Sequence, residues 1–187
     1  MDNITENLLS LIQDWDGKFK GAYNLRVDGT CAGRQSSDNI AIICKEDKPG
    51  LEIRIRPGTK GESVSIPACV THGDVDDLVY NDFYIGEDAD VLIVAGCGIH
   101  NAGSKKSEHD GIHRFHIGKN ARIKYVEKHY GEGEGTGERI LNPTTEIFMD
   151  ENAFCEMETV QIKGVDSTKR NTTAKLAAGA RLVILEK

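Results

Sequence analysis

The stretch Phe83-Tyr-Ile-Gly-Glu-Asp-Ala-Asp-Val decides the fold, because it returns along the chain at nearly fixed intervals. It returns as Phe115-His-Ile-Gly-Lys-Asn-Ala-Arg-Ile and, more weakly, as Ile147-Phe-Met-Asp-Glu-Asn-Ala-Phe-Cys. A last copy is Ala174-Lys-Leu-Ala-Ala-Gly-Ala-Arg-Leu. The anchoring alanines are spaced by 32, 32 and 27 residues: Ala89, Ala121, Ala153 and Ala180. A period of this length indicates stacked units, none of which can bury its apolar face alone.

After each anchoring alanine the chain alternates between apolar and polar residues, which is the signal of a β-strand. Copies in the same orientation predict parallel strands stacked in register. Besides the alanines, two further ladders are expected, one of Val91, Ile123, Cys155 and Leu182 and one of Ile93, Tyr125, Met157 and Ile184. The pattern favours a mainly β protein, a right-handed parallel β-helix with long, irregular coils. A left-handed hexapeptide helix would need hexads back to back, and an antiparallel sandwich is the remaining alternative.

The N-terminal region predicts a short helix and then strands. Residues 3–16 have apolar side chains at helical spacing, with Asn3 or Thr5 as the cap. We therefore divide the chain into a helical segment, residues 1–22, and a β-helix domain, residues 23–187. One early strand, Ser63 to Ile66, is expected to close at Pro67. The sequence ends inside an apparent strand, so we expect the β-helix to be truncated at its C-terminal end or covered there by a partner.

Composition excludes several classes of protein. The chain has 187 residues and a net charge of −7, which argues against non-specific binding to nucleic acid. No apolar run approaches the ~20 residues of a membrane span. The first residues lack the basic start of a signal peptide, and the five cysteines are odd in number and form no C-x-x-C pair. These features predict a cytoplasmic protein with reduced thiols and without a membrane segment.

Cys97 is the leading candidate for chemistry. It lies between Gly96 and Gly98 just past a repeat strand, and the glycine flanks predict an accessible thiol at the rim. His100 follows at Cys-x-x-His spacing, and His109 and His113 come further downstream. A thiolate and imidazoles suit zinc or iron, so Cys97, His109 and His113 are candidate metal ligands. The alternative is that Cys97 is a small buried residue and the histidines decorate a loop. Cys155 is expected in the core.

A family resemblance follows from these residues. Gly96-Cys97, then Ser107-Glu-His109, then Ile117-Gly-Lys-Asn-Ala-Arg-Ile-Lys-Tyr125 resemble the SufB/SufD family of iron–sulfur cluster assembly proteins. The resemblance covers residues 83–187 well and residues 23–82 loosely. It implies a right-handed parallel β-helix and a scaffold on which sulfur and iron are assembled. It also implies that Cys97 accepts persulfide sulfur, and His109 matches the histidine of the family's Ser-x-His motif.

The function expected from the resemblance is a scaffold subunit rather than an enzyme, with a transient iron–sulfur cluster as its cargo. Cys97 would accept sulfur as the thiolate, and His100 or His109 would stabilise that thiolate or bind iron. The implied partners are a SufC-type ATPase, a cysteine desulfurase or sulfur carrier, and a SufB/SufD-type subunit forming a homo- or heterodimer. Two alternatives remain open at this point, a hexapeptide-type acyltransferase and a plain interaction scaffold without metal chemistry.

Overall fold

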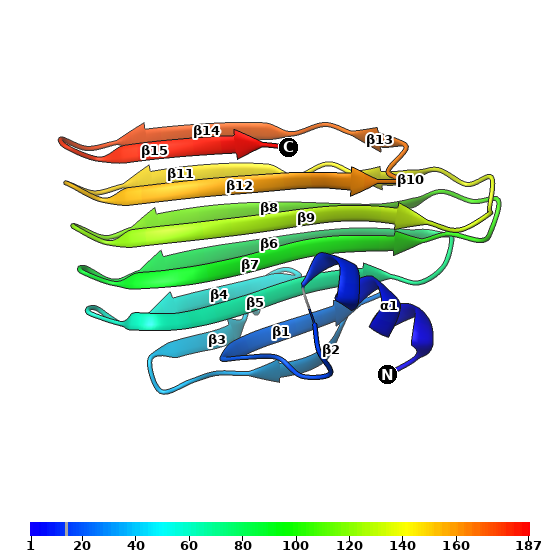
Figure 1. Ribbon diagram of the computed structural model, residues 1–187, viewed down its shortest axis with the longest axis horizontal. Helices are drawn as coiled ribbons and strands as arrows, with labels where there is room; N and C mark the ends of the chain where they lie inside the picture. The colour runs from blue at the N-terminus through cyan, green and yellow to red at the C-terminus, as the bar shows by residue number, and fades with distance from the viewer. Residues whose placement is uncertain (14) are drawn as a thin grey trace.

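The computed structural model describes residues 1–13 and 15–187, and they form a parallel β-helix of about four turns with one short helix (Figure 1). This confirms the predicted fold class. The first sheet contains, in spatial order, β15 (Arg181–Glu186), β12 (Phe154–Lys163), β9 (Arg122–Glu132), β7 (Asp90–His100), β5 (Lys60–Val70), β1 (Ala22–Val27) and β2 (Thr30–Gln35). The second contains β13 (Ser167–Thr168), β10 (Arg139–Leu141), β8 (Ser107–Ile117), β6 (Val75–Ile85), β4 (Gly50–Ile55) and β3 (Ile40–Cys44). The strand β11 (Thr144–Met149) joins β8 to β14 (Asn171–Leu176).

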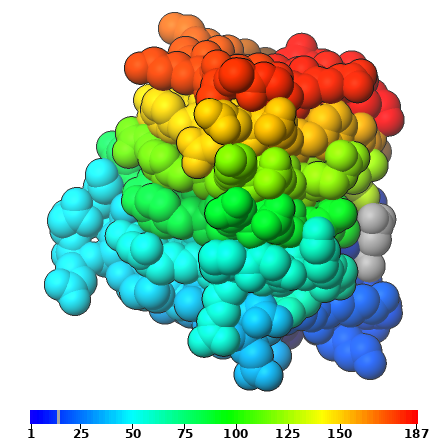
Figure 2. Space-filling model, turned by 90° about the vertical axis from the view of Figure 1, so that its left-hand side faces the viewer, coloured from blue at the N-terminus to red at the C-terminus, as the bar shows by residue number. Residues whose placement is uncertain are grey.

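The strands stack in the predicted register. Val91 pairs with Ile123, which in turn pairs with Cys155, and Tyr125 lies between Ile93 and Met157. Every residue of β6 pairs with the residue one repeat later in β8, and β7 pairs with β9 in the same way. Each of these four strands has 11 residues. The coils are therefore not hexads placed back to back. Successive coils appear as bands of colour from the N-terminal to the C-terminal end of the molecule (Figure 2).

A left-handed turn precedes each anchoring alanine. The residues just before the alanines have positive φ angles of 59°, 56°, 58° and 70°: Asp88, Asn120, Asn152 and Gly179. Asp, Asn and Gly are the residues that tolerate this backbone conformation best. The repeat therefore encodes the corner of each coil as well as its strand, because the same residue types recur at the same place.

The helix α1 (Asn3–Ile12) is shorter than the sequence predicts, and its cap differs. Asp2 is the N-cap, and its carboxylate accepts a hydrogen bond of 2.8 Å from the backbone N–H of Thr5. Leu8, Leu9 and Ile12 are fully buried against the first sheet. Within the expected span of residues 3–16, Asp14 lies outside the described residues.

Pro67 does not close a strand as predicted, because β5 continues to Val70. A proline lacks the N–H group that a sheet ladder needs, so it fits where one neighbour is missing. On the β1 side, pairing stops after Ser65 and resumes at Ala68, and Pro67 falls within that gap. On the other side Pro67 lies opposite Gly96 of β7.

The polarity of the β-helix interior changes from one end of the strands to the other. Near the end of the coils where the anchoring alanines lie, it is apolar, with the rings of Phe83 and Phe115 stacked at a centroid distance of 4.5 Å. Tyr125 meets Phe115 edge-on at 5.1 Å. Towards the other end a small apolar cluster of Ala68, Val70, Cys97, Ile99 and Leu141 remains. Beside it lie buried polar side chains: Asp77, Asn81, His109, His113, Glu127 and His129. This division places the candidate site.

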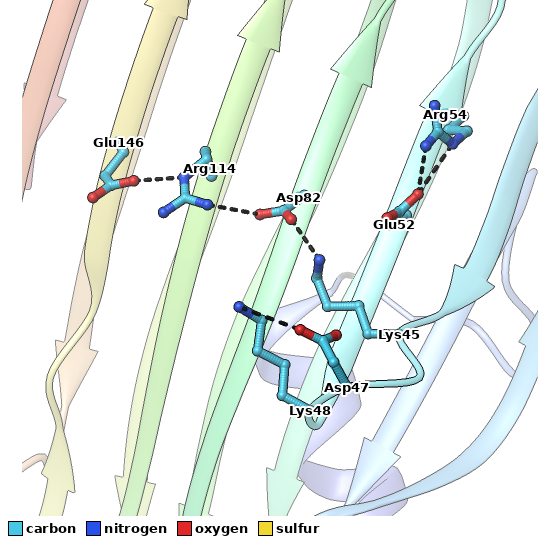
Figure 3. A network of polar contacts seen from close by, with 8 residues as sticks. All are labelled: Lys45, Asp47, Lys48, Glu52, Arg54, Asp82, Arg114 and Glu146. Carbon is cyan, nitrogen blue, oxygen red and sulfur yellow. Dashed lines mark hydrogen bonds and ion pairs between the residues drawn. The ribbon is translucent and has the colours of Figure 1, made fainter.

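The outer face of the second sheet carries two ladders. A chain of charges crosses the strands, from Lys45 to Asp82, from Asp82 to Arg114 and from Arg114 to Glu146 (Figure 3). Beside it the ring of His116 lies between the rings of Tyr84 and Phe148, at 4.9 and 5.2 Å. Both ladders join neighbouring coils on the outside.

The last coil is the most exposed. Along β14 every residue is exposed, and Ile184, in an inward register position of β15, is 45% exposed because no further described coil covers it. Among the residues that the structure describes, no helix has the length and apolar character needed to cross a membrane.

Candidate functional site

Cys97 lies inside the β-helix, so the prediction of an exposed thiol at the rim is wrong. Its side chain is only 4% exposed, and it sits between Ala68 of β5 and His129 of β9 in the sheet register. The strand β7 does not end before Cys97, as the sequence suggested, but continues to His100. Burial raises the pKa of the Cys97 thiol well above its ordinary value.

The glycines on either side of Cys97 serve the opposite face of the strand. A side chain at Gly96 would come within 2.9 Å of Ile12, and one at Gly98 within 3.1 Å of Leu8. The helix α1 therefore packs directly on the backbone of β7, and the alternation of the strand turns Cys97 to the interior. In the Gly-Cys-Gly motif, the two glycines leave room for α1 on the outer face of the sheet, and the cysteine between them points to the interior.

The thiol lines a cavity of about 290 Å³ within the coils. The same cavity is lined by His109 and His113 of β8, by Glu127 and His129 of β9, and by Asn81 of β6. Three of the predicted site residues, Cys97, His109 and His113, are thus brought to one cavity. His100 is not: it faces away from the cavity, with its Nδ1 atom 3.3 Å from a carboxylate oxygen of Glu132.

His109 is held by a buried carboxylate. Its Nδ1 atom lies 2.9 Å from Oδ2 of Asp77, and Asp77 also accepts two hydrogen bonds from Arg26, at 2.8 and 2.6 Å. Burial by itself would raise the pKa of Asp77, but Arg26 and His109 outweigh it and lower that pKa. The carboxylate therefore stays charged and fixes the imidazole through Nδ1, which leaves Nε2 as its second functional atom.

His113 is held in a similar way by a phenol. Its Nδ1 atom lies 2.9 Å from the hydroxyl of Tyr125, and that hydroxyl donates to Oε1 of Glu127 at 3.0 Å. Burial lowers the pKa of His113 to about 4. At neutral pH the His113 imidazole is therefore uncharged, and it too keeps Nε2 for other partners.

Gly111 leaves the space that the two imidazoles share. A Cβ atom placed on Gly111 would lie 2.8 Å from Nε2 of His113 and 3.7 Å from Nε2 of His109. Gly111 also lines the cavity. The absence of a side chain here lets both Nε2 atoms approach one volume inside the cavity.

Glu127 is the buried carboxylate of the cavity. Its Oε2 atom lies 2.8 Å from Nη1 of Arg170 and 3.7 Å from Nε2 of His129. Burial would raise the pKa of Glu127, but these neighbouring groups lower it well below its ordinary value. Close by, Oδ1 of the buried Asn81 has no hydrogen-bond partner in the described part of the chain. A buried amide oxygen of this kind is suited to bind a small polar guest.

The described residues contain no group of three or more His, Cys, Asp or Glu side chains arranged to hold a metal ion. Metal ligation by Cys97, His109 and His113 therefore stays a prediction. Sequence reasoning missed Asp77, Asn81, Glu127 and His129, although the period contained a signal. Asp77 precedes His109 by one repeat of 32 residues, and Cys97 precedes His129 by the same interval, so the stacking brings each pair together.

Comparison with known proteins does not assign the chain to a family. No protein-family model matches the sequence, and neither the curated proteins nor the solved structures include a significant match.

Proposed function

We propose that this protein is a scaffold subunit that accepts sulfur for iron–sulfur cluster assembly, rather than an enzyme in its own right. The observation that carries the proposal is the cavity inside the coils, which brings together a buried thiol and two imidazoles whose Nε2 atoms share one space. The resemblance of residues 83–187 to the SufB/SufD family supports the same function. In that family the residue matching Cys97 receives the sulfur.

The chemistry at Cys97 would be a transfer of sulfane sulfur. The Cys97 thiolate attacks the outer sulfur of a donor persulfide, a new S–S bond forms, and the donor leaves as a thiolate. Because burial raises the pKa of Cys97, the thiol must lose its proton as the donor arrives. His109, oriented by Asp77, is the group that we assign to take this proton. A persulfide formed inside the coils would be shielded from water and from oxidants.

Iron and the cluster enter this proposal as cargo. Cys97, His109 and His113 supply one sulfur and two nitrogen donors, which are ligand types that iron accepts. Because the described residues form no three-ligand group, cluster assembly would draw further ligands from a partner subunit of the SufB/SufD type. A SufC-type ATPase would drive the conformational change, a cysteine desulfurase or carrier would supply sulfur, and the site of action would be the cytoplasm.

The test is to trap the persulfide. The protein is incubated with a cysteine desulfurase and cysteine, alkylated, and its peptides are weighed by mass spectrometry. The Cys97 peptide should gain one sulfur atom, and Cys97→Ser should lose that product. Cys155→Ser is the matched control, because Cys155 is also buried but packs in the apolar core. Equal sulfur transfer to the parent and to Cys97→Ser would remove Cys97 from this role.

A second measurement concerns the cargo. Anaerobic incubation with iron, sulfide and the partner subunits should produce the visible charge-transfer absorption of an iron–sulfur cluster, and His109→Ala should weaken it. A colourless complex with parental persulfide formation would restrict the protein to sulfur acceptance. A protein that neither accepts sulfur nor gains colour would be a plain interaction scaffold.

A further inference from the structure

Two other thiols line the same cavity as Cys97, and both are exposed. Cys31 lies on β2 and Cys44 at the end of β3, at the N-terminal end of the β-helix. They are 13 residues apart in the sequence and come from strands of different sheets. The cavity therefore has a sulfur atom in its buried part, on Cys97, and two more where its lining reaches the surface.

One guanidinium group connects the two exposed thiols. Arg34 Nη2 lies 3.4 Å from the sulfur of Cys31, and the Arg34 side chain also contacts the thiol of Cys44. Arg34 is itself fixed, because its Nε atom donates to Oδ1 of the buried Asn24 at 2.9 Å. Partial burial would lower the pKa of Arg34, but contact with Cys44 and Cys31 outweighs it and raises that pKa. Arg34 therefore places a fixed positive charge beside the sulfur of Cys31.

The charges of the lining favour an anionic guest. Four cationic side chains line the cavity, Arg26, Arg34, Lys45 and Lys48, against one described carboxylate, Glu127. Lys45 is paired with Asp82, Arg26 with Asp77 and Lys48 with Asp47. Arg34, by contrast, contacts only neutral oxygens and thiols among its described partners. The positive charge of Arg34 is thus directed at the two sulfurs. A cavity of about 290 Å³ also limits the guest to a small molecule.

We propose that Cys31, together with Cys44 and the Arg34 guanidinium, forms a second sulfur-acceptor site at the mouth of the cavity, and that its donor is a small anionic persulfide. The Cys31 thiolate attacks the outer sulfur of the donor R–S–SH, a Cys31 persulfide forms, and R–S⁻ departs with the electron pair of the broken S–S bond. Transfer from Cys31 to Cys97 repeats this exchange, with Cys31 as the leaving thiolate. The inference rests on the proposed function, since it names a donor class for sulfur that ends on Cys97.

The experiment uses the full chain and glutathione persulfide as the probe. Samples are quenched by alkylation at increasing times, and each cysteine peptide is weighed. The Cys31 peptide should gain sulfur before the Cys97 peptide does. The double variant Cys31→Ser, Cys44→Ser should slow labelling of Cys97 by about tenfold or more. Arg34→Gln should slow labelling of Cys31, and Arg34→Lys should restore part of the rate. Because both thiols are exposed, unchanged circular dichroism is expected and serves as the control for folding.

The outcomes separate this inference from the proposed function. If the double variant labels Cys97 at the parental rate, the site at the mouth is overturned, while Cys97 remains the acceptor. If Cys31 gains sulfur and Cys97 never does, with any donor, the role of Cys97 fails and the acceptor at the mouth stands. If a desulfurase-bound persulfide labels Cys31 but glutathione persulfide does not, the small-donor class is overturned.

Discussion

The two halves of the β-helix interior obey different rules, although the same strands build both. Around Phe83, Phe115 and the anchoring alanines, every inward position is apolar and identical faces stack from coil to coil. A few residues before Phe115 in β8, the inward positions hold His109, Gly111 and His113, and a cavity replaces the close packing. The comparison shows that a repeat can specify the coil with one half of each strand and leave the other half for chemistry.

The largest expected effect concerns the apolar half. Phe115→Ala removes a fully buried ring that stacks on Phe83 and meets Tyr125 edge-on, so it should destabilise the fold by about 3–5 kcal/mol. The measurement is the free energy of unfolding in denaturant. Phe148→Ala is the matched control, because Phe148 stacks on His116 on the outside and should cost no more than about 1.5 kcal/mol. Equal losses would mean that the apolar half is not the main support of the fold.

This difference also explains what the sequence could predict. The ladders through Val91 and Ile93 follow from period and alternation alone, because one frame recurs and every copy must bury the same face. The contacts of Asp77 with His109 and of Cys97 with His129 were within reach for the same reason, because each pair is one repeat apart. The burial of Cys97 was not, because it depends on β7 continuing beyond the repeated frame, which keeps Cys97 in the inward register. The role of Gly96 and Gly98 was out of reach as well, because α1 lies over them. Contacts between a non-repeating segment and the coils leave no periodic signal.

The second prediction tests the polar half through pH. Burial lowers the pKa of His113 from its ordinary 6.5 to about 4, so between these values the unfolded chain carries a proton that the folded chain excludes. Above pH 6.5 the imidazole is uncharged in both states and does not change the unfolding free energy. As the pH drops from 6.5 to 4, the unfolding free energy falls by up to about 3 kcal/mol, because only the unfolded chain gains the proton. His113→Asn should flatten the dependence of the unfolding free energy on pH in that window.

The control for this prediction lies in the neighbouring groups. Glu127, His109, His129 and Arg170 all act electrostatically on His113 and are present in both proteins. Because His113 also helps to lower the pKa of Glu127, the difference between the two pH profiles reports the imidazole together with its effect on that carboxylate. Parallel profiles from pH 4 to 6.5 would show that His113 is not kept uncharged by its burial.

The third prediction enlarges one buried residue in each half of the interior. Ala121→Leu enlarges a fully buried side chain where neighbouring coils leave no room, and it should cost about 1–3 kcal/mol. Gly111→Ala places a methyl group near Nε2 of His113, but that is the end of a side chain beside a cavity, so we expect less than about 1 kcal/mol. Unfolding free energies compare the two. A larger cost for Gly111→Ala would show that the imidazole is held rigidly.

The same variant separates stability from function. In Gly111→Ala the methyl group occupies the space between the two Nε2 atoms, so sulfur transfer to Cys97 should slow even though the fold is nearly unaffected. Arg122 is the neighbour of Ala121 in the sequence, but its side chain faces outward. Arg122→Ala should therefore change neither the stability nor the rate of sulfur transfer by a measurable amount.

The smallest expected effect lies outside both halves, on the charge ladder of the second sheet. Arg114 contacts Glu146 at 2.6 Å and Asp82 at 3.9 Å, but its side chain is 39% exposed, so water and salt screen these ion pairs (Figure 3). Arg114→Gln should therefore lower the unfolding free energy by no more than about 1 kcal/mol, and less at high salt. Lys119→Gln, at a more exposed ion pair with Glu151, is the control and should change it by under about 0.5 kcal/mol. If Arg114→Gln instead matched Phe115→Ala, the outer ladder would rival the apolar half as a source of stability, and the division of the molecule proposed above would be wrong.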